Sequence, residues 1–289
     1  MRRALIALVL AACGSEHSPA TPPATLAAFA PQITALLARH HVPGAAIARV
    51  RGDAIETAAF GDVAPDTVFQ AASLTKPLFA RTVLLSGVPV DATARQLLLH
   101  AATGRWAYSG PGYVQLQRYV EQATHEPLDR LANRLVLEPL HLAHTTLVTP
   151  PGALATGHGK DGQPTATQRW PEPLASSSLH TTAADYAAFV RSLFGAPLDT
   201  MLATTVPVGE NDLQWSLGWA IETWRGDRWF FHWGANPGFR SFVLGSNARR
   251  EAIVILTDGD NGLDLAEDLV ELVRGERHPL FQFRMLHPE

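Results

Sequence analysis

The sequence has 289 residues, of which 46% are hydrophobic and 17% are charged. This hydrophobic content is enough for a folded core and excludes a disordered or fibrous chain. The formal net charge is −4 and no basic block follows Arg2 and Arg3, which excludes a nucleic-acid-binding protein. We therefore expect one two-part globular domain or two small domains.

The first 13 residues have the pattern of an export signal. Arg2 and Arg3 are its positive region, and the apolar run over 4–12 is too short to span a bilayer. Cys13 is the only cysteine of the chain, so it cannot form an internal disulfide. The run over 10–13 resembles a bacterial lipobox, in which the cysteine is lipidated. We expect residues 1–23 to be a lipoprotein signal and tether that anchors the protein to a membrane, facing the periplasm or the cell exterior. An ordinary cleaved signal is the alternative.

The first part of the domain combines a helix with a hairpin. Apolar residues at helical spacing predict a helix that begins near Leu26 and ends before Pro43. Two short strand-like runs over 45–50 and 54–60 flank a Gly-containing turn, which predicts a hairpin. A second helix is expected to begin at about Ser73 and to end near Gly87.

The middle of the chain is mostly helical and the last part is mostly strand-like. Between Asp91 and Gly195 the periodicity predicts helices over 94–100, 112–123, 128–137 and 182–194. Strands follow over 215–224, 228–232, 239–244 and 251–258, and a helix over 263–274 stops at Gly275. We expect an α/β (α+β) domain over 24–289. Its antiparallel sheet is flanked by N- and C-terminal helices in an α/β part (24–72 and 205–289), with an inserted, mainly helical part over 73–204.

A serine and a lysine stand three residues apart where the second helix should begin. Residues i and i+3 lie on one helix face, so the Lys76 amine can lie beside the Ser73 hydroxyl. Pro77 is tolerated only in the first turn, where the N–H groups have no partner inside the helix. The chain has only two lysines against 21 arginines. A buried lysine can act as a base and an arginine cannot, so this lysine indicates chemistry. An N-terminal capping serine followed by a solvated lysine is the alternative.

Two later stretches can complete a serine hydrolase site, which needs a nucleophile, a base and donors for an oxyanion. Tyr108 lies in a loop rich in glycine and proline, and it can relay a proton if a nearby lysine lowers its pKa. His232 lies on an expected strand, followed by Trp233, Gly234 and Ala235. The backbone N–H of Ala235 is free to point at a carbonyl oxygen.

Taken together and in order, these motifs resemble the penicillin-recognising serine hydrolases, specifically the class C β-lactamase and D-alanyl-D-alanine peptidase branch. Residues 73–76 match its Ser-x-x-Lys motif, residues 108–110 its Tyr-x-Asn and residues 232–234 its Lys/His-Thr/Ser-Gly. Residues 97–104 also look like its Leu-Leu-x-His-x-Ser-Gly turn. The resemblance covers about residues 26–274 and implies a β-lactamase/transpeptidase-like fold.

The resemblance also implies roles for individual residues. Ser73 would attack an acyl carbon, and Lys76 and Tyr108 would share the general-base and general-acid work, with the first proton acceptor left open between them. The N–H groups of Ser73 and Ala235 would form the oxyanion hole, and His232 would tune the pair or contact substrate.

Two residues depart from the family pattern. Gly110 stands where the family has an asparagine amide, and Trp233 replaces a small hydroxyl residue beside Gly234. These departures weaken the expectation of β-lactam or D-Ala-D-Ala recognition, although Gly110 and residues 232–234 are still expected to border the substrate.

We expect an exported serine hydrolase that acts on a small ester or amide and needs no cofactor. Its partners would be a small-molecule or peptide substrate and a membrane, and we expect a monomer. The alternative is a non-catalytic penicillin-binding-like sensor that has lost turnover. A metal-dependent hydrolase is disfavoured because His125 and Glu126 are followed by Pro127, without a second histidine at ligand spacing.

Overall fold

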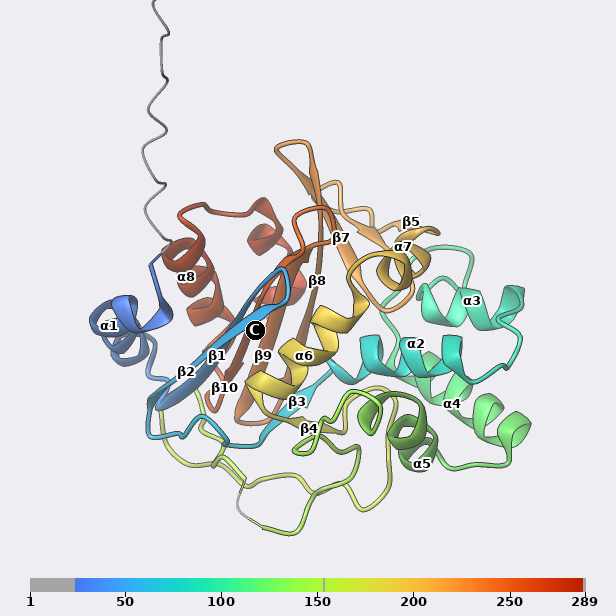
Figure 1. Ribbon diagram of the computed structural model, residues 1–289, viewed down its shortest axis with the longest axis horizontal. Helices are drawn as coiled ribbons and strands as arrows, with labels where there is room; N and C mark the ends of the chain where they lie inside the picture. The colour runs from blue at the N-terminus through green and yellow to red at the C-terminus, as the bar shows by residue number, and fades with distance from the viewer. Residues whose placement is uncertain (1–23, 153, 288–289) are drawn as a thin grey trace, which may run out of the picture.

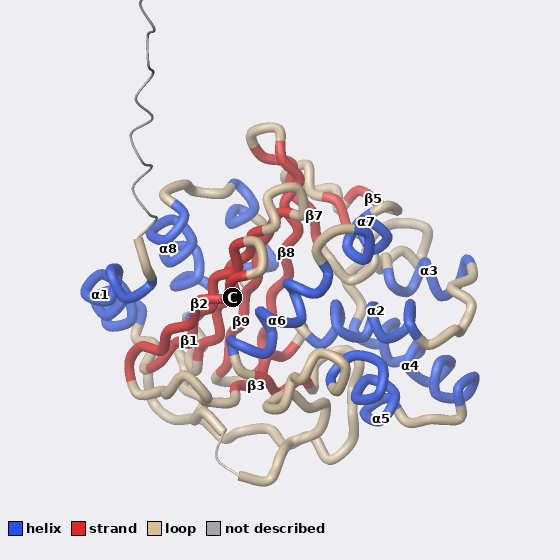
Figure 2. The backbone as a smooth tube through the Cα atoms, viewed as in Figure 1, coloured by secondary structure: helices blue, strands red, loops and turns tan. Residues whose placement is uncertain are grey.

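The computed structural model describes residues 24–152 and 154–287. Their main element is an eight-stranded antiparallel sheet with helices on both faces, shown in Figures 1 and 2. The strand order is β2-β1-β10-β9-β8-β7-β6-β5. The strands are β1 (Gly44–Arg51), β2 (Ala54–Gly61), β5 (Val206–Pro207), β6 (Gln214–Trp215), β7 (Ala220–Trp224), β8 (Asp227–Asn236), β9 (Phe239–Ser246) and β10 (Glu251–Thr257). The first and last parts of the chain thus share one sheet, as expected.

Helices cover the two faces unequally. One face carries α1 (Ala30–His40), α8 (Gly262–Arg274) and the short helices η1 (Leu26–Phe29), η3 (Pro279–Gln282) and η4 (Arg284–Leu286). Helix α6 (Ala183–Leu193) packs on β1, β2 and β10 from the other side, where the remaining helices also lie. These are α2 (Thr75–Leu85), α3 (Ala92–Leu98), α4 (Gly110–Thr124), α5 (Leu128–Ala132), the π-helical η2 (Asn133–Leu137) and α7 (Ala196–Leu202).

The sheet is buried on both faces because its central strands are apolar at nearly every position. In β1, Ala45 and Ile47 pack toward α1 and α8, whereas Ala46 and Ala48 pack toward α6. This follows from the two-residue period of a strand. The two hydrophobic layers hold β8, β9 and β10 rigidly in the middle of the molecule.

The expected antiparallel sheet, its flanking helices and the helical insertion are confirmed, and most element bounds agree within a few residues. The expected continuous strand over 215–224 is wrong. Gly218 has φ +83° and turns the chain, so β6 and β7 form a hairpin with each other. Helix α7 and a two-stranded sheet of β3 (Phe69–Ala72) and β4 (Leu179–Thr181) were not predicted. Such strands are too short for a periodic signal.

Strand β3 brings the Ser73 segment to the main sheet. It pairs with β4 and packs against β8 and β9, and α2 begins two residues after Ser73. Pro77 is the third residue of α2, where a missing N–H costs no helical hydrogen bond. Within the described residues, no helix is long and apolar enough to cross a membrane.

Candidate active site

The turn that carries Ser73 is held from three sides. Ser241 on β9 donates to the Ala71 carbonyl (2.8 Å), and the Tyr186 hydroxyl on α6 donates to the Leu74 carbonyl (3.1 Å). The buried Thr75 hydroxyl donates to the Ala72 carbonyl (2.6 Å) and accepts from the Leu179 N–H (3.0 Å). The position of the nucleophile is therefore fixed by the packing of the whole domain.

Ala72, just before Ser73, has a left-handed backbone with φ +49°. This conformation is uncommon for a residue with a side chain and costs about 1–3 kcal/mol unless its surroundings impose it. Gly234 allows it, because a Cβ on Gly234 would lie 2.3 Å from the Ala71 oxygen and 3.0 Å from the Ala72 Cβ. Glycine at 234 is thus required for β8 to approach the Ser73 turn this closely.

Ser73, Lys76 and a backbone carbonyl form the polar centre of the site. The Lys76 Nζ lies 2.8 Å from the Ser73 Oγ and 2.7 Å from the Ser176 carbonyl oxygen. The same carbonyl accepts a hydrogen bond from the Ser73 hydroxyl at 3.2 Å. The expected side-by-side placement of Ser73 and Lys76 is what the structure shows, one turn apart at the start of α2. In this geometry a neutral amine can accept the Ser73 proton.

Lys76 is buried so deeply that its charged form is disfavoured. Lys76 is only 1% exposed, and this burial lowers the pKa of its amine to about 7. Two rings oppose this shift, since Nζ lies 4.7 Å from the Tyr108 ring centroid and 5.7 Å from that of Tyr113. Such contacts are worth about 1–2 kcal/mol, or about one pKa unit, which is less than the effect of burial. Burial therefore brings the loss of the Lys76 proton into the range near neutral pH.

Tyr108 lies beside this pair, but its phenol is a poor base. Burial raises its pKa above the ordinary value, and the neighbouring Ser73 hydroxyl offsets only part of that shift. The lowering of the Tyr108 pKa that a nearby lysine would cause is therefore not found. Among the described residues, no group other than the neighbouring Ser73 hydroxyl is placed to bond the buried Tyr108 hydroxyl. The phenol is thus a proton donor at neutral pH.

Two buried histidines, His100 and His232, lie near the Lys76 amine. Burial and the neighbouring Lys76 hold the pKa of both imidazoles well below the usual value. The His100 Nδ1 accepts from the Ser109 N–H (3.0 Å), which assigns its proton to Nε2. The His232 Nδ1 lies 2.7 Å from the Trp233 carbonyl and therefore donates to it, which leaves Nε2 as an acceptor. Neither Nε2 has a partner among the described residues.

Ala235 lies on an open strand edge next to Ser73. The pairing of β8 with β7 ends at Phe231, so among the described residues 232–236 pair only with β9. Ala235 is exposed on this edge. Strand β3, which ends one residue before Ser73, packs against β8, and Gly234 of β8 lies close to Ala71 and Ala72. This arrangement suits two backbone donors aimed at one oxygen.

The two departures from the family pattern take different places. Gly110 begins α4, and a Cβ there would lie 3.6 Å from the Cβ of Ser176. Ser176 thus occupies the direction in which a side chain at 110 would point, and its carbonyl holds Lys76. Trp233 is only 5% exposed and stacks on Tyr108 with ring centroids 5.5 Å apart. Trp233 therefore packs against Tyr108 and exposes little surface to a substrate.

Sequence reasoning missed Ser176 as a partner of the lysine. Its contribution is a backbone carbonyl, which every residue type offers, and it lies 100 positions from Lys76. His100 was recognised only as part of a family-like turn, because nothing in the local sequence indicates that it reaches Lys76.

Some expectations lie outside what the structure describes. Cys13 belongs to residues 1–23, which are not described. In the described part of the chain, no group of three His, Cys, Asp or Glu side chains is placed to hold a metal ion.

Comparison with known families supports this reading of the fold. A sequence profile described as Beta-lactamase matches residues 87–275. The matched range contains Tyr108, His232 and Ala235 and begins after Ser73 and Lys76. A search of curated protein sequences finds no match.

Solved structures with related folds include three with hydrolase or penicillin-binding names. The D-alanine carboxypeptidase AmpC from Burkholderia cenocepacia has a TM-score of 0.72 and 18% identity, covering 86% of this chain and 97% of its own. The D-stereospecific amidohydrolase from Streptomyces sp. has a TM-score of 0.66 and 17% identity, covering 83% and 97%. The octameric penicillin-binding protein homologue from Pyrococcus abyssi has a TM-score of 0.71 and 15% identity, covering 89% and 79%. At these identities the likeness concerns the fold.

The protonation of Lys76 should control reaction at Ser73. We expect the rate of labelling by a fluorophosphonate probe to rise about tenfold per pH unit up to an inflection near pH 7, and then to level off. The neutral amine is present above that pH, whereas the nearby imidazoles and phenols do not titrate there.

The control for this pH profile is Asp258→Asn. Asp258 also has a pKa of about 7, but it accepts from the Gly44 N–H at the start of β1 and makes no contact with Ser73 or Lys76. The Asp258→Asn profile should match that of the wild type. A labelling rate that does not change between pH 5 and pH 9 would contradict a lysine base with this pKa.

Proposed function

The chain belongs to the beta-lactamase family, and on that premise we propose that it is a serine hydrolase that forms an acyl-enzyme on Ser73. One observation carries the proposal. The Ser73 Oγ lies 2.8 Å from the amine of Lys76, a residue only 1% exposed whose pKa is lowered to about 7. A serine beside a neutral amine in a water-poor site is an activated nucleophile.

The first step is proton transfer from Ser73 to Lys76 as the hydroxyl oxygen attacks an acyl carbon. Between Lys76 and Tyr108, the charges favour Lys76 as the first acceptor, because burial keeps the Tyr108 phenol protonated. The Ser176 carbonyl accepts a hydrogen bond from the resulting ammonium and so stabilises it (2.7 Å). The backbone N–H groups of Ser73 and Ala235 would stabilise the oxyanion, and Ala235 lies on a part of β8 that does not pair with β7.

The second requirement is a proton for the leaving group. The Tyr108 hydroxyl is a suitable donor because burial keeps it protonated and it lies next to the Ser73 hydroxyl. The His232 Nε2 is an acceptor and the ring lies against Tyr108, with centroids 6.3 Å apart. It can orient the phenol or take part in returning a proton, and as a neutral ring it does not replace a lysine charge.

The substrate class follows from what the site lacks. No side-chain amide is present at Gly110, where an added Cβ would make an ordinary contact with Ser176. An acylamino substituent like that of a penicillin therefore has one fewer side-chain donor and acceptor near Lys76. An activated ester needs little beyond the nucleophile and the oxyanion donors, so we propose small esters or simple amides as substrates.

A non-catalytic binding protein is the competing function. It is favoured by the same absence of an amide at Gly110, since a site can retain acylation and lose the hydrolysis that follows. Such a protein would accumulate the acyl-enzyme and show no turnover after a first burst.

We expect a higher kcat/KM for a nitrophenyl ester than for a chromogenic cephalosporin, by about tenfold or more. Steady-state kinetics with both substrates measures this ratio, and Ser73→Ala is the control for hydrolysis elsewhere on the protein. A preference for the cephalosporin would refute the substrate proposal but not the acyl-enzyme, whereas a burst without turnover would identify the binding protein.

Export and anchoring are a separate part of the proposal. The support is the sequence pattern at 1–13, with the single cysteine at its end. We propose that the mature protein begins at a lipidated Cys13 and faces the periplasm or the cell exterior. The expected monomer stays a prediction, and one protein of similar fold is described as octameric.

Lipidation at Cys13 is measured by the intact mass of protein extracted from membranes. We expect the chain to begin at Cys13 with added acyl mass, and we expect Cys13→Ser to leave the protein out of the membrane fraction. An N-terminus downstream of residue 13 without acyl mass would show an ordinary cleaved signal instead.

A further inference from the structure

A second polar cavity lies far from Ser73, at the opposite end of the sheet. It has a volume of about 320 Å³ and is lined by five arginines, Arg49, Arg51, Arg225, Arg249 and Arg274, together with Glu251 and Glu276. We call it the arginine cavity. Along β8, the distance from Asp227 near this cavity to Ala235 near Ser73 is about 27 Å at 3.4 Å per residue. The arginine cavity is therefore not part of the acyl-enzyme site.

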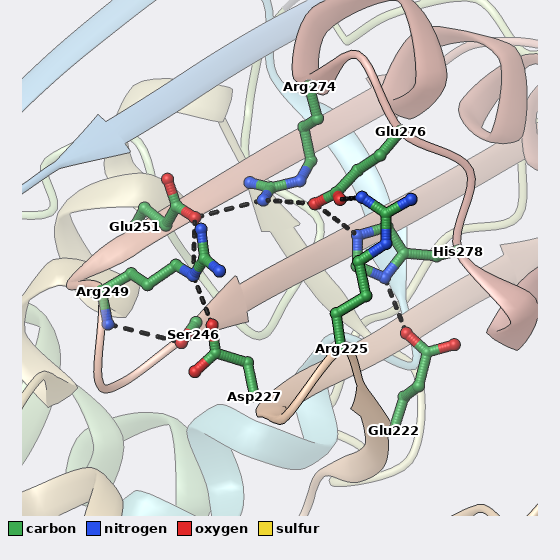
Figure 3. Close-up of polar contacts among 9 residues, drawn as sticks. All are labelled: Glu222, Arg225, Asp227, Ser246, Arg249, Glu251, Arg274, Glu276 and His278. Atoms are coloured by element: carbon green, nitrogen blue, oxygen red, sulfur yellow. Dashed lines mark hydrogen bonds and ion pairs between the residues drawn. The ribbon is translucent and has the colours of Figure 1, made fainter.

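The five arginines come from four separate places in the chain. Arg49 and Arg51 are at the end of β1, Arg225 is in the β7–β8 turn, Arg249 is in the β9–β10 turn and Arg274 ends α8. Figure 3 shows three of these guanidinium groups grouped with the acidic side chains between them. The fold thus concentrates positive charge from distant segments in one cavity.

Aromatic rings and carboxylates hold the arginines in place. The guanidinium of Arg274 lies 4.3 Å from the Trp229 ring centroid and that of Arg249 lies 5.4 Å from the same ring. Arg225 lies 5.4 Å from the Trp224 ring. Groups that are already ordered lose little conformational entropy when they bind a ligand. Arg49 and Arg274, whose side chains are only 9% and 12% exposed, are therefore ordered before any ligand enters.

The carboxylates present do not use all of the guanidinium donors. Four acidic side chains form ion pairs with these arginines: Glu56, Asp227, Glu251 and Glu276. Five guanidinium groups offer about 25 N–H donors, and four carboxylates offer about 16 acceptor sites. Within the described residues, Arg51 makes no ion pair and the buried Arg274 Nε has no acceptor.

We propose that the arginine cavity binds a phosphate group. Planar guanidinium groups from several directions suit a tetrahedral anion, which accepts hydrogen bonds on all of its oxygens. Glu251, Glu276 and the carboxyl end of α8 oppose an anion, so the binding should be moderate and should weaken as salt is added. The cavity is larger than one phosphate ion requires, which fits a phosphate carried on a larger molecule.

The position of the arginine cavity in the molecule is compatible with two sources of a phosphate group. The Arg49 Nη2 donates to the Ala24 carbonyl (2.7 Å), so the cavity adjoins the point where the chain leads to residues 1–23. If Cys13 carries a lipid, a phospholipid headgroup is within reach of this face. A free phosphorylated molecule is the other source.

Inorganic phosphate is the first probe, measured by titration calorimetry on the full chain carrying Cys13→Ser, at constant ionic strength set with chloride. We expect saturable binding that weakens about tenfold or more in the double variant Arg51→Gln/Arg225→Gln. Both side chains are exposed, so their replacement should leave the fold intact, as the thermal midpoint will show. The double variant Arg118→Gln/Arg130→Gln removes two exposed arginines elsewhere and should bind phosphate like the wild type.

Vesicles identify the source of the phosphate group. Phosphatidylcholine vesicles with and without phosphatidylglycerol are sedimented with the same proteins. Binding to the anionic vesicles that is lost in Arg51→Gln/Arg225→Gln supports a headgroup, and phosphate binding without vesicle binding supports a free phosphorylated molecule. The absence of saturable phosphate binding, or equal binding by the wild type and this double variant, would overturn the proposal and leave the cluster a structural ion-pair network.

Discussion

The burial of one amine organises the chemistry of this protein. Lys76 lies in the interior of the domain, where its only hydrogen-bond partners among the described residues are the Ser73 hydroxyl and the Ser176 carbonyl. Full burial of a lysine is unfavourable unless the group gives up its charge or finds strong partners. The protein therefore keeps a group that is ready to accept a proton next to a serine.

The close approach of two backbones is the second constraint. The left-handed turn at Ala72 and the glycine at 234 permit β3 to lie against β8, which places Ser73 beside the open edge of the sheet. Ser241 and Tyr186 fix this turn from β9 and from α6. The position of Ser73 thus depends on contacts with both the sheet and the helical side of the molecule, so disturbing either part would move it. The β7–β8 and β9–β10 turns, at the other end of the same strands, contribute to the arginine cavity instead.

Much of the fold and part of the candidate site could be predicted from local sequence patterns. The β1–β2 hairpin and strands β8–β10 were predictable because apolar runs alternate with turn residues, and α8 was predictable because its apolar residues follow the helical period. The spacing of Ser73 and Lys76 predicted their contact on one helix turn. The short strands β3 and β4 have no period to detect, yet they position the nucleophile. The role of Ser176 could not be predicted, because a backbone carbonyl has no sequence signal. The rise of the Tyr108 pKa is caused by burial, and burial depends on tertiary packing.

The most direct test of the central claim is to map the residue labelled by a fluorophosphonate probe and to compare three variants. We expect a single modified residue, Ser73, no labelling in Ser73→Ala or Lys76→Arg, and slowed but measurable labelling in His232→Ala. Lys76→Arg is decisive because it keeps the positive charge and cannot act as a base, and loss of a general base costs about 10²- to 10⁴-fold in rate. Near wild-type labelling of Lys76→Arg, with none in His232→Ala, would instead assign the base to the histidine and contradict the account.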